Sequence, residues 1–198
     1  MTHSYIAEKG LTLVELLVAI ALVGAVLGIG LPSFQSMMQS SRMTGDYNSL
    51  NASLNFARSE AIKRASAVSL CARATENSCG EDWSRGWLVF DDAGATQGFI
   101  DAEESVLKSV TREDTTLTIE NRARLNTGAA TPVARPFIQF RPRGTANWLG
   151  AGYFLLCDES GTDGARVANI SLAGSIRRGR EDASGNLLNA FNEAATCP

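Results

Sequence analysis

A single long run of apolar residues stands near the start of the chain. Between Leu11 and Leu31 the only charged side chain is that of Glu15. In a helix, which rises about 1.5 Å per residue, this run extends over roughly 31 Å and can cross the hydrocarbon core of a bilayer. Because no second run of this kind follows, we predict one membrane-spanning helix over residues 11–34 and exclude a protein with several membrane spans.

Glu15 is an unusual residue for a membrane helix. A carboxylate deep in lipid costs about 2.5–3.5 kcal/mol on insertion scales, and more when it has no partner. Two interpretations stay open: the side chain reaches the headgroup region, or it meets a cationic partner when the protein leaves the lipid or assembles. A secretory signal ends its apolar run in a cleavage site of small residues, whereas this run continues through Pro32. The removable segment is therefore the polar stretch in front, residues 1–10.

The residues that lead into this run have a recognisable pattern, Lys9-Gly10-Leu11-Thr12-Leu13-Val14-Glu15. It resembles the class III signal of type IV pilins and type II secretion pseudopilins. The resemblance implies that a prepilin peptidase cuts between Gly10 and Leu11 and that the new amino terminus is methylated. It also implies that Glu15 pairs with the terminal amine of a neighbouring subunit during assembly. Leu11 departs from the family pattern, in which phenylalanine is commoner at this position.

The same resemblance implies a location and a set of partners. We expect a single-pass protein of the bacterial inner membrane with its head in the periplasm, which enters a pilus or pseudopilus filament. Its expected partners are other pilin or pseudopilin subunits, the prepilin peptidase and the inner membrane.

The segment after the apolar run, residues 35–66, continues the helical pattern but is amphipathic. Its apolar residues recur at intervals of three and four, which places them on one helical face: Met43, Tyr47, Leu50, Leu54, Ala57 and Ala61. The opposite face is polar and is interpreted as the solvent side: Asp46, Asn48, Asn55, Arg58 and Lys63.

Residues 67–198 show the pattern of short strands separated by glycine, asparagine and aspartate. The predicted strands are 68–71, 86–91, 106–110, 115–119, 137–140, 153–157 and 167–172. Residues 87–90 and 153–156 are apolar on both alternations, which is typical of central strands. The predicted fold class is therefore α+β: a long N-terminal helix packed on an antiparallel, β-rich head, as in type IV pilins.

A second motif indicates one particular family among the pilins and pseudopilins. The sequence Trp83-Ser84-Arg85-Gly86-Trp87-Leu88-Val89-Phe90-Asp91 resembles a signature of the GspH/FimT family of minor pilins and pseudopilins. The segments 140–144 and 156–157 follow in the order that this family shows. We interpret the tryptophans as core residues that mark the family without a chemical role.

Four cysteines and one histidine limit the chemistry of the head. An even number of cysteines in an exported domain favours two disulfides, with three possible connectivities and free thiols as the alternative. We favour Cys71 with Cys79, which flank a short polar loop, and Cys157 with Cys197, which would tether the tail. His3 lies ahead of the apolar run and no catalytic arrangement is evident, so we expect no enzyme, no cofactor and no metal site.

Charge is unevenly distributed along the head, although the whole chain carries a net charge of only −3. Residues 81–120 are acidic, and the carboxylates between Asp91 and Glu104 are of the type that calcium prefers, but their spacing does not match an EF-hand. Residues 135–180 are rich in arginine, and Arg177, Arg178 and Arg180 lie within four positions. Arginine forms bidentate contacts with phosphate, so this cluster indicates a polyanion as partner.

The arginine cluster resembles the Gly-Arg-x-Arg motif of FimT-type members, which contacts DNA during natural transformation. Ser175 stands here in place of the first arginine of that motif. We predict sequence-independent binding of double-stranded DNA through phosphate contacts by Arg177, Arg178, Arg180, Arg143 and Arg141. Two alternatives remain: a basic edge strand that discourages aggregation, and a structural pseudopilin of a type II secretion system that acts at the tip or in initiation.

Overall fold

The computed structural model describes residues 12–113, 116–124, 129, 131–147 and 152–198, with only the helical backbone described for residues 28–33. The predicted leader 1–10, and with it the processing residues Gly10 and Leu11, lies outside the described residues. The chain divides into two compact units, residues 1–42 and residues 43–198.

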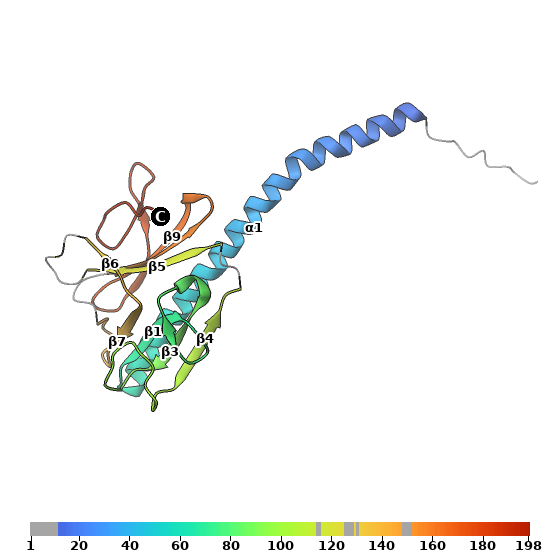
Figure 1. The fold of residues 1–198 in the computed structure, drawn as a ribbon. Coiled ribbons are helices and arrows are strands. Elements are labelled where there is room, and N and C mark those ends of the chain that lie inside the picture. The colour runs from blue at the N-terminus through green and yellow to red at the C-terminus, as the bar shows by residue number, and fades with distance from the viewer. Residues whose placement is uncertain (1–11, 114–115, 125–128, 130, 148–151) are drawn as a thin grey trace, which may run out of the picture. The chain divides into compact units, whose positions relative to one another are not determined.

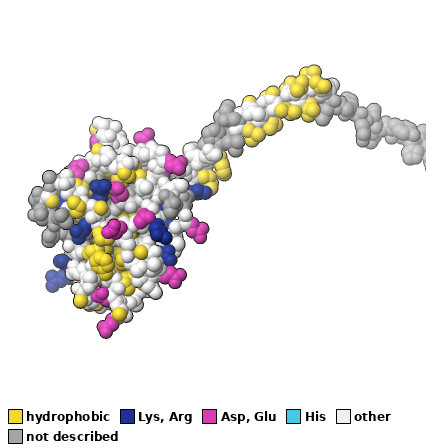
Figure 2. Space-filling view, in the orientation of Figure 1, with side chains coloured by type: hydrophobic (Ala, Val, Ile, Leu, Met, Phe, Trp, Pro, Cys, Tyr) yellow, Lys and Arg dark blue, Asp and Glu magenta, His cyan; other side chains and the backbone are white. Residues whose placement is uncertain are grey.

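The helix α1 runs from Leu13 to Arg64. It begins after Thr12, whose hydroxyl oxygen accepts a hydrogen bond from the backbone N–H of Glu15 at 3.2 Å, as an N-cap residue does. Within the first unit the large apolar side chains from Leu13 to Leu27 are exposed, and Figure 2 shows them along the surface of the helix. Over the part of the chain with described positions, no helix combines the length and the apolar character needed to cross a membrane.

The part of α1 in the second unit packs on the sheets of the head. All six apolar residues of the predicted face are buried, from Met43 to Ala61. The sequence placed Asp46 and Arg58 on the solvent side, and this interpretation was wrong for both. The carboxylate of Asp46 forms an ion pair of 2.9 Å with Arg112, whose side chain is only 5% exposed. Arg58 donates two hydrogen bonds to the head.

In the described part of the chain, the strands of the head form two antiparallel sheets of five strands each. Their arrangement in the head can be followed in Figure 1. In the first sheet the order is β2-β1-β3-β4, and β7 also pairs with β1. Its strands are β1 (Val68–Arg73), β2 (Cys79–Gly80), β3 (Gly86–Asp91), β4 (Val106–Thr111) and β7 (Phe137–Phe140). A short 3-10 helix, η1 (Trp83–Arg85), precedes β3.

The second sheet has the order β10-β9-β8-β5-β6. Its strands are β5 (Thr118–Ala123), β6 (Val133–Ala134), β8 (Gly152–Asp158), β9 (Gly161–Ile170) and β10 (Ile176–Arg178). A separate pair joins β11 (Arg180–Glu181) to β12 (Leu187–Leu188). The sequence predicted an antiparallel head but not its division into two sheets, and it placed the strand now seen as β5 too early.

β3 and β8 are buried on both faces and lie between two neighbouring strands, which confirms that they are central strands. One face of each sheet belongs to a shared core with α1, to which Trp87 and Phe154 contribute. The other face of the first sheet is covered by Ile100 and Phe137. The other face of the second sheet is covered by the C-terminal tail, residues 186–198, through its apolar side chains: Leu187, Ala190, Phe191, Ala195 and Cys197.

The described residues form two disulfides, and both are the pairings that the sequence favoured. Cys71 is bonded to Cys79, eight residues away, and joins β1 to β2. Cys157 is bonded to Cys197, forty residues away, and joins β8 to the tail. None of the described cysteines is free.

Candidate functional site

The predicted arginine cluster follows a tight hairpin turn between β9 and β10. Gly174 has a φ of +71°, which glycine adopts at little cost, and its N–H donates to the Ser171 carbonyl at 2.8 Å. The hydroxyls of Ser171 and Ser175 lie 2.7 Å apart. Ser175, which stands where FimT-type members have an arginine, therefore stabilises the turn instead of presenting a charge.

A second turn, residues 141–144, lies directly against this hairpin and carries the two other predicted arginines, Arg141 and Arg143. The N–H of Gly144 donates to the Arg141 carbonyl at 2.7 Å. Gly144 and Gly174 are in close approach, because a Cβ on Gly174 would lie 1.9 Å from the carbonyl oxygen of Gly144. The two arginine-bearing segments, far apart in sequence, are thus neighbours in the fold.

Arg58 of α1 holds the two turns together. Its Nε donates to the Gly144 carbonyl at 3.0 Å, and its Nη2 donates to the Ala173 carbonyl at 3.1 Å. The sequence does not indicate this role, because the helical pattern alone assigns Arg58 to the polar face. The glycines after Arg143 and Ala173 gave a signal for two turns, but nothing in the pattern placed those turns beside the helix.

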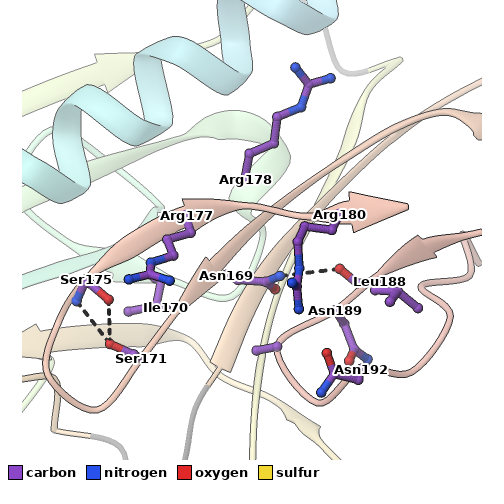
Figure 3. A pocket seen from close by; sticks show the side chains of 11 residues that line it. Asn169, Ile170, Ser171, Ser175, Arg177, Arg178, Arg180, Leu188, Asn189 and Asn192 are labelled. Carbon is purple, nitrogen blue, oxygen red and sulfur yellow. Dashed lines mark hydrogen bonds between the residues drawn. The ribbon is translucent and has the colours of Figure 1, made fainter. Parts of the chain in front are cut away.

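The three clustered arginines do not share one face. Side chains alternate along a strand, so Arg177 and Arg178 of β10 point to opposite sides. The strand breaks at Gly179, whose N–H donates to the Val167 carbonyl at 2.7 Å, and pairing then passes from β9 to β12. Figure 3 shows Arg180 on the same side as Arg177, with Arg178 directed away from both. Arg177 and Arg180 therefore lie on one side of the strand and Arg178 on the other, although all three stand within four positions of the sequence.

Arg177 and Arg180 border a pocket of about 480 Å³ between the β9–β10 hairpin and the tail. Its lining is mainly polar, with amide and hydroxyl groups from both segments: Asn169, Ser171, Ser175, Asn189 and Asn192. Arg178 also borders the pocket, but its side chain points to the other side of the strand (Figure 3).

The tail wall of the pocket is an ordered turn built around Asn189, which is 5% exposed. The side-chain oxygen of Asn189 accepts from the N–H groups of Phe191 and Glu193 at 2.8 and 3.2 Å. On β8, burial raises the pKa of the Tyr153 hydroxyl above its ordinary value. Arg124 stacks over the Phe191 ring at 4.1 Å and pairs with Glu193 at 2.9 Å.

The turn between β11 and β12 is stabilised by Asp182. Its carboxylate accepts from the side chain and backbone of Asn186 at 3.0 and 2.9 Å and from the N–H of Ser184 at 2.8 Å. The side-chain bond from Asn186, followed by these backbone bonds, lowers the pKa of Asp182. The Asp182 carboxylate thus accepts hydrogen bonds within its own turn and does not pair with the arginines.

The five arginines of the predicted interface, Arg141, Arg143, Arg177, Arg178 and Arg180, are all exposed. None of the ion pairs within the described ranges involves any of them. Unpaired guanidinium groups on two adjacent turns can each donate to an anion without breaking an internal contact.

The carboxylates of the acidic segment after β3 accept hydrogen bonds from the loop itself and from neighbouring strands. Asp92 is buried and accepts from Ser69, from the side chain of Gln139 and from the N–H of Gly98. Glu104 accepts from the backbone of residues 94 and 101. Where positions are described, no group of three or more His, Cys, Asp or Glu side chains is arranged to hold a metal ion.

The fold is that of a type IV pilin, with one N-terminal helix packed on antiparallel sheets. It is similar to the crystal structure of the type IV minor pilin FimU of Pseudomonas aeruginosa (strain PAO1) in space group P21. The two share 25% sequence identity over 76% of this chain and 96% of that one, with a TM-score of 0.54. A second crystal structure of FimU, in space group P65, shares 27% sequence identity over 71% of this chain and 92% of that one, with a TM-score of 0.49.

Two family models also match the sequence. The prokaryotic N-terminal methylation motif matches residues 7–31, and the model described as "Type II transport protein GspH" matches residues 46–175. The chain therefore belongs to the GspH family and is a minor pilin or pseudopilin. A search of curated proteins found no significant match.

Proposed function

We propose that this chain is a minor type IV pilin that enters a filament through its N-terminal helix and binds double-stranded DNA through its arginines. In this proposal a prepilin peptidase cuts between Gly10 and Leu11, the new terminus is methylated, and the helix anchors the protein in the inner membrane before assembly. The proposed role is structural and DNA-binding, without an enzymatic step.

The exposed apolar surface of α1 supports the assembly step. Large apolar side chains between Leu13 and Leu27 are 51–75% exposed. Isolated water-soluble proteins rarely expose so many neighbouring apolar side chains, so this part of the helix requires lipid or other helices around it. Glu15 is exposed on the same segment and is available to a cationic partner such as the terminal amine of another pilin subunit.

The five exposed, unpaired arginines are the observation that carries the DNA-binding proposal. Arg141 and Arg143 stand on the 141–144 turn, and the other three follow the neighbouring β9–β10 turn; Arg58 bonds both turns. In the described part of the chain, none of the five takes part in an ion pair that DNA would have to displace. Contacts of this kind neutralise phosphates and do not read bases, so binding is expected to be independent of sequence and sensitive to salt.

The DNA-binding proposal is tested with the full-length chain in mild detergent and a duplex of random sequence. If about three to five phosphates are engaged, the logarithm of the affinity falls against the logarithm of salt concentration with a slope of roughly −3 to −4.5. Replacing all five arginines by alanine is expected to abolish binding at low salt. A wild-type chain that shows no shift of duplex DNA at low salt contradicts the proposal.

A second candidate function is that of a structural pseudopilin in a type II secretion system. The observation in its favour is the description of the matching family model as a type II transport protein. A deletion strain separates the two candidates: loss of DNA uptake with intact protein secretion supports the pilin, and loss of secretion with intact uptake supports the pseudopilin.

A further inference from the structure

A pocket of about 330 Å³ lies at the outer edge of the second sheet, between η1, β5 and the connection from β6 to β7. We propose that this pocket binds a short peptide segment of another filament subunit, one that carries an acidic and a basic group close together. The pocket acts in this way only if the chain enters a filament, as proposed above, and it acts independently of DNA.

The pocket occupies a gap in the pairing of β5. This strand pairs with β6 over its last two residues only, and the N–H of Arg135 then donates to the Asn121 carbonyl at 2.8 Å. Further along the same edge, the N–H of Ile119 donates to the hydroxyl of Ser84 at 3.3 Å. Between these two contacts no described strand lies against this edge of β5. Side chains therefore surround the gap.

A partner cannot simply extend this edge as a further strand. β6 has only two residues, and Pro132 and Pro136 stand on either side of it. Proline has no N–H to donate, and short edge strands flanked by proline discourage the addition of another strand. An occupant is therefore held by the side chains of the pocket.

Two buried polar groups on the pocket wall have no hydrogen-bond partner. Asn121 is 1% exposed; its amide donates to the Phe137 carbonyl at 3.3 Å, but its side-chain oxygen has no partner. The Nε of Arg135 is likewise buried and without a partner. One group is an acceptor and the other a donor, and small rotations of the two side chains bring both to an occupant. A ligand that offers a donor and an acceptor therefore stabilises this wall.

Two charged side chains of the pocket are also free of ion pairs. Over the part of the chain with described positions, neither the exposed Glu81 nor the partly buried Arg135 takes part in one. Arg135 contacts only the Phe137 ring, with its Cζ 6.0 Å from the ring centre. Glu120, by contrast, pairs with Arg122 at 2.7 Å. One free carboxylate and one free guanidinium match a ligand that carries both signs of charge.

The floor of the pocket is apolar and fixed. Trp83 is 3% exposed, and its indole N–H donates to the Arg135 carbonyl at 3.1 Å. The ring of Phe154 packs edge-on against it, with the ring centres 4.8 Å apart. A preformed apolar floor with a few polar groups above it is typical of ligand pockets of this size.

A peptide of another subunit fits this combination better than a sugar does. Each peptide residue offers one N–H and one C=O, and its side chains supply both signs of charge. A neutral sugar would leave Glu81 and Arg135 without an ionic partner. The chain belongs to a family of minor pilins and pseudopilins, so the heads of other subunits are the proteins that this edge meets in a filament.

The first experiment is an NMR titration of the full-length, detergent-solubilised chain with labelled tryptophan. The probes are two capped peptides, acetyl-Lys-Ala-Asp-amide and acetyl-Asp-Ala-Lys-amide, and the uncharged control is acetyl-Gln-Ala-Asn-amide. At least one charged peptide is expected to shift the indole signal of Trp83 and to saturate at about 1–10 mM. The signal of Trp87, which is buried outside the pocket, should not move. No shift at Trp83, or equal shifts with the control, would overturn the proposal.

The second experiment repeats the titration with charge variants. Glu81→Gln and Arg135→Gln are each expected to weaken peptide binding at least about tenfold. Both should keep the fold, because Glu81 is exposed and the hydrogen bonds of Arg135 to the head come from its backbone. Glu76→Gln and Arg85→Gln remove the same charges from exposed positions outside the pocket and should bind as the wild type does. Losses no larger than those of these controls would overturn the pocket.

The third experiment identifies the occupant in filaments sheared from cells. Ala134 lines the pocket and is exposed, whereas its exposed neighbour Val133 does not line it. The photoreactive variant Ala134→p-benzoylphenylalanine is expected to crosslink to a segment of another subunit with both signs of charge, and Val133→p-benzoylphenylalanine is not. A crosslink only to a protein that is not a filament subunit, equal crosslinks from both positions, or none would overturn the pocket. Absence of the wild-type chain from filaments would instead overturn the proposed filament entry.

Discussion

Replacing Arg58 by alanine removes the contact that holds the two arginine-bearing turns against α1. Its Nε bonds the Gly144 carbonyl at 3.0 Å in a partly buried setting, and its Nη2 bonds the Ala173 carbonyl at 3.1 Å at the surface. A hydrogen bond from a charged donor contributes about 1.5–3 kcal/mol when it is shielded. Water replaces most of the exposed bond, so we expect Arg58→Ala to lower the free energy of unfolding by about 2 kcal/mol.

The assay is urea unfolding of the full-length chain in detergent, followed by tryptophan fluorescence, since Trp83 and Trp87 are buried in the head. Lys63→Ala is the matched control on the same helix: its amine meets only Glu60 at 3.4 Å on the exposed surface, and we expect a loss below about 0.5 kcal/mol. Arg58→Lys keeps the charge but not the fork of donors and should fall between the two. A loss for Arg58→Ala no larger than that of the control would show that the two hydrogen bonds of Arg58 do not stabilise the head.

Three further predictions concern the stability of the head. Gly174→Ala should lower the free energy of unfolding by about 2–4 kcal/mol in urea, because of backbone strain and overpacking. Gly185→Ala, with a φ of +83° and open space around it, should lower it by only about 1 kcal/mol. Similar losses for the two variants would contradict the close approach of Gly174 to Gly144. The pKa of Asp182 is lowered by Asn186, so its carboxylate stabilises the turn above about pH 4 and loses this contribution as the pH falls through the lowered pKa of the folded state. In an NMR titration, Asn186→Ala should raise the pKa of Asp182. An unchanged pKa would show that Asn186 is not the cause. Arg112→Ala leaves a helix carboxylate without its partner and should cost about 3 kcal/mol in the same unfolding assay, and a neutral result would show that the pair contributes nothing.

The sequence predicted the elements whose periodicity comes from burial. The spacing from Met43 to Ala61 gave the packed face of α1, and the double apolar pattern of residues 87–90 and 153–156 gave the central strands. The sequence shows these patterns because buried positions are apolar and exposed positions are polar, so burial leaves a periodic trace in the residue types. The short loop between Cys71 and Cys79 likewise favoured its disulfide before any geometry was known.

The rest of the site depends on contacts between segments that are far apart in the sequence. Nothing local to Arg58 indicates that it bonds two turns 86 and 115 residues away. The break at Gly179 changes which side Arg180 faces, and a break of this kind depends on the partner strand rather than on the local pattern. The tail wall around Asn189 follows from packing on β8, which no periodicity in residues 182–198 records.

The most direct test of the proposed role is the intact mass of this chain recovered from filaments sheared from the cell surface. We expect a polypeptide that begins at Leu11 and carries one methyl group on its terminal amine. A chain that is absent from such filaments, or that is recovered with Met1 to Gly10 still attached, would contradict it.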